Sequence, residues 1–382
     1  MTVSIAACGS YESQEVRTAL AALLEPLGGL DWVQPGMKIA IKANLVTFMK
    51  PEAAATTHPA LLCALIEMLT EKGASVTLGD SPGGLYNGIF LNRVYAATGM
   101  KAAEQAGATL NRNFSVKEAS FPEAKTAKTF SYTGWLDEAD AIINFCKLKT
   151  HGMMAMSGAA KNMFGAVPGT VKPEYHYRFP NPADFADMIV DLNEYFKPRL
   201  AIIDGVVGME GNGPTAGTPR PIGILIASEN PHAADLLGSA IIGLKPSEVP
   251  TLTAAMKRGL IPEHPEELEL CGINWRERII PDYQLVETTH SLRFSKDSEK
   301  FFGKIFSKIA DRALASRPQL KKSECVGCRE CEKICPADAI TMKSKKPQID
   351  RKQCIRCFCC QEFCPKGALK VHRPTLAKML SK

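Results

Sequence analysis

The chain has 382 residues, of which 45% are apolar and 23% are charged, a composition typical of a globular protein with one large domain and room for a smaller one. Its charge is uneven: residues 1–295 carry 25 basic against 31 acidic residues, whereas residues 296–382 carry 21 against 9. No run approaches the roughly 20 apolar residues of a membrane-spanning helix, and no nucleic-acid-binding motif accompanies the basic part, so we expect neither a membrane span nor a nucleic-acid partner.

The acidic part of the chain alternates between apolar strands and helices. Short apolar runs predict strands over residues 3–8, 38–44, 75–80, 140–148, 200–208 and 222–228. Helix-like segments lie between them, over residues 14–24, 59–72, 183–196 and 233–242. Because the strands are apolar without alternation, they are typical of a layered α/β fold with a mostly parallel sheet. We predict such a domain over residues 1–295.

Polar residues follow the ends of several predicted strands. The carboxyl ends of parallel strands meet at one edge of an open sheet, and ligands bind there. The residues expected to bind a substrate are Lys42, Asn44, Asp80, Ser81, Lys147, Asn162, Asp204 and Glu210. The turn "GDSPGG" matches neither dinucleotide-binding nor Walker-type phosphate motifs. A flavin is a further candidate ligand, although no dedicated phosphate loop supports it.

The segment "KLKTHGMMAMSGAAKNMFG" (147–165) is the richest in chemistry. By itself it fits a ligand site and a solvated lysine face about equally, but its place after a strand favours a site. We assign Lys149 and Lys161 to holding an anion, and His151 to donating a proton, because histidine titrates near neutral pH.

A helix is expected from about Ser157. It would place Ser157 and Lys161 on one face and bury Met156 and Met163 on another. Its N-terminus would add partial positive charge to the site.

Residues 299–314 predict an amphipathic helix, with phenylalanines and isoleucines on one stripe and lysines opposite. Such a helix could lie on a membrane surface. Packing between two domains is the favoured interpretation, and we predict a helical linker over residues 296–320.

Nine of the 13 cysteines fall between positions 325 and 364, in two copies of the pattern CxxCxxCxxxCP. In two-cluster bacterial ferredoxins with this spacing, three cysteines of each copy bind one 4Fe-4S cluster and the fourth binds the other. We assign the first cluster to Cys325, Cys328, Cys331 and Cys364. The second is assigned to Cys354, Cys357, Cys360 and Cys335. Zinc ribbons and disulfides are alternatives that fit the spacing less well.

The predicted ferredoxin-like α+β module covers residues 321–373. Cys359 is left over, and we expect it to be a small apolar residue beside a cluster.

At these motifs the sequence resembles domain-of-unknown-function family 362, whose members often end in a two-cluster ferredoxin module. The matching segments are "KANLV" (42–46), "THP" (57–59), "GDSPGG" (79–84), "CKLKTH" (146–151), "GAAKNMFGAVPG" (158–169) and "IIDGVVGMEGNGP" (202–214). The resemblance implies an iron–sulfur protein of anaerobic or facultative metabolism. It implies no particular reaction.

The favoured hypothesis is a cytoplasmic iron–sulfur oxidoreductase. Electrons would come from a redox partner, which is a ferredoxin, a flavodoxin or a reductase, and would pass through two 4Fe-4S clusters to a small anionic substrate. The alternative is a non-enzymatic electron carrier or assembly factor whose large domain binds a partner protein. Hydrolytic or transfer chemistry ranks last, because the sequence has no GxSxG or HExxH motif.

Overall fold

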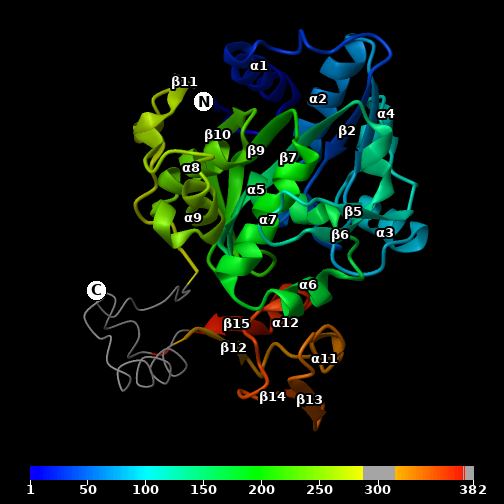
Figure 1. The fold of residues 1–382 in the computed structure, drawn as a ribbon, viewed down its shortest axis with the longest axis vertical. Coiled ribbons are helices and arrows are strands. Elements are labelled where there is room, and N and C mark those ends of the chain that lie inside the picture. The colour runs from blue at the N-terminus through cyan, green and yellow to red at the C-terminus, as the bar shows by residue number, and fades with distance from the viewer. Residues whose placement is uncertain (287–314, 373, 375–382) are drawn as a thin grey trace.

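The computed structural model describes residues 1–286, 315–372 and 374. The large domain is built on one sheet, with the small C-terminal module packed below it (Figure 1). In spatial order the strands are β11 (Glu269–Gly272), β1 (Thr2–Ala7), β10 (Thr218–Ser228), β9 (Leu200–Glu210), β7 (Ala141–His151), β2 (Lys38–Lys42), β3 (Ser75–Gly79) and β4 (Thr109–Leu110). Neighbouring strands are parallel from β9 to β4, while β10 is antiparallel to both its neighbours. The predicted α/β fold with a mostly parallel sheet is confirmed.

Helices cover both faces of the sheet. The predicted helices are present as α1 (Ser13–Leu24), α2 (Pro59–Glu71), α7 (Pro182–Phe196) and α8 (Pro231–Ile241). Consecutive residues of β7 show the two faces, because Phe145 packs with α1 and α2 while Cys146 packs with α8. The remaining elements of this domain are α3 (Gly88–Ala97), α4 (Ala102–Gln105), β5 (Val116–Ser120), β6 (Thr129–Thr133), β8 (Ala155–Ser157), α5 (Ala159–Asn162), α6 (Lys172–Arg178) and α9 (Pro250–Lys257).

The segment after β7 differs from the prediction. β7 continues to His151, turns, and returns as β8, so Ser157 lies on a strand opposite Lys149. The expected long helix is only the four residues of α5, followed by a 3-10 turn over Met163–Ala166. The methionines of the segment are buried, as predicted.

The N-terminus of α5 adds no free positive charge to the site. Its first backbone N–H groups are taken by the Asp235 carboxylate, with distances of 2.6 Å from Ala159 N and 2.9 Å from Ala160 N. The expected role of this helix end in ligand binding is therefore corrected. Asp235 instead fixes the position of α5.

The small module contains two strand pairs and two short helices. The pairs are β12 (Arg317–Leu320) with β15 (Leu369–His372) and β13 (Ile340–Lys343) with β14 (Lys346–Ile349). The helices are α11 (Glu330–Lys333) and α12 (Cys359–Glu362). Because β12 belongs to the sheet of the module, the end of the predicted helical linker is corrected. The rest of that predicted linker, up to residue 314, lies outside the described residues.

Hydrogen bonds hold α12 against the loop that follows β9. The side-chain amide of Gln361 donates to the carbonyl oxygens of Asn212 (2.9 Å) and Gly213 (3.3 Å). The Thr215 hydroxyl donates to the Glu362 carbonyl oxygen at 2.9 Å. These bonds place α12 beside the carboxyl end of β7, where a ligand site is expected.

Across the described ranges, no helix combines the length and apolar character needed to cross a bilayer.

Candidate functional site

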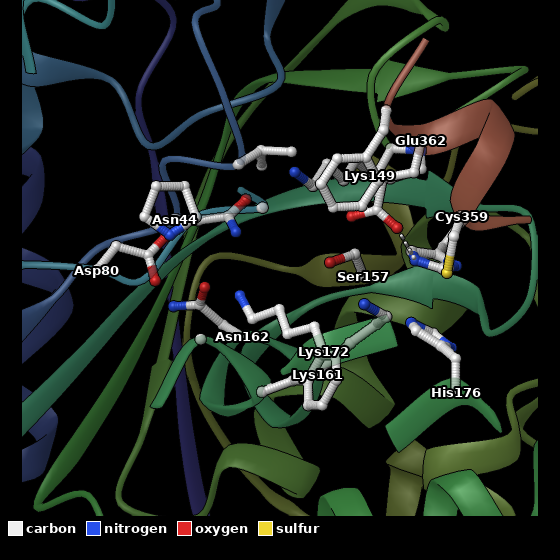
Figure 2. Close-up of a pocket in the computed structure, with 18 of the residues that line it drawn as sticks. Asn44, Asp80, Lys149, Ser157, Lys161, Asn162, Lys172, His176, Cys359 and Glu362 are labelled. Atoms are coloured by element: carbon white, nitrogen blue, oxygen red, sulfur yellow. Dashed lines mark ion pairs between the residues drawn. The ribbon is translucent and has the colours of Figure 1, made fainter. Parts of the chain in front are cut away.

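A cleft lies at the carboxyl ends of the central strands, between the two parts of the chain. Counting its open mouth, it encloses about 600 Å³. The large domain supplies most of its walls, and α12 supplies the rest (Figure 2). Its polar and sulfur-bearing lining consists of Asn44, Asp80, Lys149, His151, Ser157, Lys161, Asn162, Lys172, His176, Cys359 and Glu362. The cleft thus lies at the sheet edge where the sequence predicts a ligand site.

Only part of the predicted site lines the cleft. The predicted residues that reach it are Asn44, Asp80, Lys149, His151, Lys161 and Asn162. The predicted residues that lie outside its lining are Lys42, Ser81, Lys147, Asp204 and Glu210. Each of these five has a partner or a position that accounts for the difference.

Lys42 is buried in an ion pair beneath the cleft. Its ammonium group lies 2.6 Å from Asp80 Oδ1 and 3.2 Å from Asn162 Oδ1. The other carboxylate oxygen of Asp80 accepts the Leu45 N–H at 2.8 Å. Both charges are therefore satisfied within the fold, and Lys42 is corrected from a ligand-binding residue to a structural one.

Lys147 likewise forms an ion pair within the fold. It lies 2.5 Å from Asp204 Oδ2 and donates to the hydroxyl of Tyr11 at 2.9 Å. The pairing of β7 with β9 shifts register between Lys147 and Lys149, and of the two lysines only Lys149 lines the cleft. Asp204 is saturated by the same network, receiving the His58 N–H at 3.0 Å. Neither Lys147 nor Asp204 contacts the cleft.

The other two predicted residues, Ser81 and Glu210, accept hydrogen bonds from backbone N–H groups of the large domain. Ser81 accepts the N–H of Gly169 through its hydroxyl at 2.7 Å, and its carbonyl oxygen accepts a hydrogen bond from Lys172. Glu210 accepts the N–H of Gln284 at 3.1 Å. Ser81 therefore shapes the wall of the cleft, and Glu210 is corrected to a residue outside it.

Three lysines bring unneutralised charge to the cleft. Lys149 donates to the Ala55 carbonyl oxygen at 2.5 Å, and Lys172 donates to a carbonyl oxygen. Within the described part of the chain, Lys161 has neither a hydrogen bond nor an ion pair, and its ammonium group lies 5.6 Å from the centre of the Phe164 ring. Carbonyl oxygens carry no net charge, so these three ammonium groups favour an anionic ligand.

Burial lowers the pKa of all three lysines. The pKa of Lys149 falls to about 7 and that of Lys172 to about 8, and that of Lys161 is also lowered, in each case mainly by desolvation. An anion in the cleft would favour the charged forms. These lysines are therefore poised to take up a proton when an anion binds.

His151 is held as a neutral hydrogen-bond donor. Its Nδ1 accepts the N–H groups of Met153 (3.1 Å) and Met154 (3.2 Å), so the ring proton is assigned to Nε2. Burial, with the charge of Lys161 adding to it, lowers the pKa of His151 well below its usual range. The expected proton donor that titrates near neutral pH is therefore corrected. His151 instead presents Nε2–H to the cleft.

Several lining residues could not be predicted from the sequence. Lys172 and His176 lie on α6, which follows no predicted strand. Cys359 and Glu362 lie on α12, inside the second cysteine motif, and reach the cleft only because the module docks there. Cys359 is fully buried, but it lines the cleft.

The cysteines of the module gather as the spacing predicts. One cavity of about 350 Å³ is lined by Cys325, Cys328, Cys331 and Cys364, although Cys364 comes from the other motif. Among the described residues, no three His, Cys, Asp or Glu side chains are arranged to hold a single metal ion. Four thiols from two motifs around one cavity fit a 4Fe-4S cluster.

The second set also lies together. Burial raises the pKa of the Cys360 thiol, and the nearby thiols of Cys357, Cys354, Cys335 and Cys331 raise it further. The first three, with Cys360, are the cysteines assigned to the second cluster, and Cys331 belongs to the first set. The two predicted sets therefore lie close to each other.

The fold and the cysteine module together define an iron–sulfur protein with a large α/β domain. The family model "Domain of unknown function (DUF362)" matches residues 39–240, just over half of the chain, and the chain belongs to this family. A 4Fe-4S dicluster domain matches residues 324–368. The family resemblance and the ferredoxin-like module are confirmed.

Two known proteins are similar to this chain. The thylakoid-associated protein sll1697 of a Synechocystis species is 32% identical over 300 residues, covering 77% of this chain and 90% of the relative. The lactate racemase apoprotein of Thermoanaerobacterium thermosaccharolyticum gives a TM-score of 0.38 at 13% identity. That match covers 62% of this chain and spans 55% of the racemase chain.

Proposed function

We propose that the protein is an iron–sulfur oxidoreductase that delivers electrons to a small anionic ligand bound in the cleft. The observation that carries the proposal is the composition of the cleft walls. Lys149, Lys161 and Lys172 face it from the large domain, and α12, which holds Cys360 and ends two residues before Cys364, closes it. The helix α12 would thus belong both to the wall of the ligand site and to the module that supplies the electrons.

The eight cysteines would hold two 4Fe-4S clusters, which supply electrons at low potential when bound. The large domain's own residues bind and orient the ligand. The three lysines hold its negative charge, and Nε2–H of His151 donates a hydrogen bond to it. The amide of Asn44, two residues after β2, lines the same space, as does the amide of Asn162, which donates to the Lys42 carbonyl oxygen of β2.

Enclosure strengthens these interactions. Lys149 and His151 are almost fully buried, so few waters screen them from a bound anion. The pair formed by Lys42 and Asp80 supports the floor without adding net charge. The positive charge of Lys149, Lys161 and Lys172 therefore remains available to attract the ligand.

The electron source in this proposal is a ferredoxin, a flavodoxin or a reductase, and the compartment is the reducing cytoplasm. The Synechocystis relative is named for association with thylakoids, which makes cell fractionation a useful check. A bound flavin would be a variant of the proposal. An anaerobic absorption spectrum with iron, sulfide and flavin assays distinguishes the two.

The proposal is tested on the full-length protein, purified anaerobically and reduced with dithionite. The rate of cluster reoxidation is measured with a panel of small carboxylates and oxyanions. We expect at least one acceptor to reoxidise the clusters, and expect Lys149→Ala and His151→Ala to slow that rate by at least tenfold. Lys128→Ala, which removes an exposed lysine outside the cleft, should leave it unchanged.

Two results would count against the proposal. One is an acceptor-dependent rate that neither cleft variant changes. The other is reoxidation by a stoichiometric protein partner only, with no small acceptor effective, which would favour the carrier or assembly-factor alternative.

A further inference from the structure

Glu362 brings a carboxylate of the ferredoxin-like module into the cationic cleft. It lies at the end of α12 and points into the cleft (Figure 2). Its Oε2 lies 3.8 Å from Nε2 of His151, the ring nitrogen that carries the proton. The other carboxylate in the lining, Asp80, is already paired with Lys42. Glu362 is thus the carboxylate available to the three lysines.

The charge of Glu362 acts on the residues proposed to bind the ligand. It favours the charged form of Lys149, Lys161 and Lys172 against the effect of burial. A carboxylate and an ammonium group attract each other more strongly in a partly buried site than in bulk water. The negative charge of Glu362 therefore acts on the three lysines as the charge of a bound anion would.

The backbone of Glu362 is fixed, whereas its side chain is free to move. Thr215 bonds its carbonyl oxygen, and the neighbouring Gln361 anchors α12 to the loop after β9. In the part of the chain that the structure describes, no hydrogen bond holds the carboxylate, and 22% of the side chain is exposed. A rotation of the side chain would clear the cleft without undocking the module.

We propose that Glu362 is an internal competitor for the anion site, which a ligand must displace from the lysines and His151. This inference rests on the proposed function. A singly charged carboxylate would replace Glu362 with little gain in charge, whereas a doubly charged oxyanion gains one charge. The site therefore selects doubly charged oxyanions, of the phosphate type, over simple monocarboxylates.

The test measures binding of sulfate and acetate to the full-length protein by anaerobic calorimetry near pH 6.5, where sulfate carries two charges and acetate carries one. Glu362→Gln keeps the shape of the side chain and removes its charge. We expect this variant to bind both anions about tenfold more tightly than the unaltered protein, which should itself bind sulfate more tightly than acetate. The matched control, Glu330→Gln on α11, removes a carboxylate paired with Lys333 on the module surface and should change neither affinity.

The outcomes separate the two proposals. If Glu362→Gln leaves both affinities within twofold, or weakens them, while Lys149→Met abolishes binding, the anion site stands and competition by Glu362 is refuted. If sulfate binds Glu362→Gln but not the unaltered protein, competition is supported in its strongest form. If no variant binds either anion, both proposals fail.

Discussion

Replacing Lys149 with methionine should stabilise the fold while removing its ligand binding. Burial lowers the pKa of Lys149 from 10.5 to about 7, and no carboxylate is paired with it at ion-pair distance among the described residues. At pH 7.5 a lysine that is charged when unfolded and held largely neutral when folded costs about 4 kcal/mol. Losing the hydrogen bond to Ala55 returns about 1 kcal/mol of that. The net gain is about 3 kcal/mol.

Lys147→Met is the matched control, since Lys147 lies two residues away and is equally buried. Its removal leaves the Asp204 carboxylate buried without its cation, which should cost about 3–5 kcal/mol. The two substitutions are chemically identical, yet the structure predicts opposite signs.

Urea unfolding followed by tryptophan fluorescence measures both effects, because all three tryptophans lie in the large domain. Between pH 7 and 10.5 the unfolded chain binds the Lys149 proton and the folded chain does not. The stability that Lys149 contributes therefore rises with pH, and the advantage of Lys149→Met should shrink toward zero near pH 10.5. If Lys149→Met destabilises the domain as much as Lys147→Met, the reasoning is refuted.

Three further predictions follow from the site. Sulfate, which stays doubly charged over this range, should bind with constant affinity well below pH 7 and more weakly as pH rises through 7 and 8, because Lys149 and Lys172, with pKa values of about 7 and about 8, lose the protons that attract the anion; calorimetry should also show proton uptake on binding. Cys359→Ala should retain all bound iron, whereas Cys360→Ala should lose up to about half, by iron and sulfide assay; equal losses would contradict the assignment of cluster cysteines. Gly165→Ala should destabilise the large domain by about 1–3 kcal/mol in urea unfolding, because a methyl group there meets the paired side chains of Asp80 and Lys42; an unchanged midpoint would contradict that packing.

The parallel strands of the sheet, and the sheet edge at which the cleft lies, could be predicted from the sequence. Apolar runs mark buried parallel strands, and their carboxyl ends necessarily meet. Lys149, His151 and Asn44 reach the cleft for this reason. The cysteine pairing was predictable too, because cluster geometry fixes the spacing.

What could not be predicted depends on contacts between distant segments. Nothing near Lys147 in the sequence indicates that Asp204 will form an ion pair with it, while Lys149, two positions on, has no ion-pair partner among the described residues. The protonation of His151 is decided by a tight turn that aims two backbone N–H groups at its Nδ1. Such outcomes need three-dimensional positions.

The part of the cleft wall that α12 forms could not be predicted from the sequence either. Glu362 reads as an ordinary residue between two cluster cysteines, and it reaches the site only through docking of α12 on the loop at Asn212–Thr215. Docking is set by a few polar contacts that leave no periodic pattern in the sequence.

The central claim is that an anion site and two clusters share one boundary in this fold. The most direct measurement is an anomalous-scattering map from crystals grown anaerobically and soaked in arsenate, a phosphate analogue. We expect iron peaks beside the two cysteine sets and an arsenic peak between Lys149, Lys161 and Nε2–H of His151. Iron peaks with arsenic bound only elsewhere, or no arsenic at all in the cleft, would contradict it.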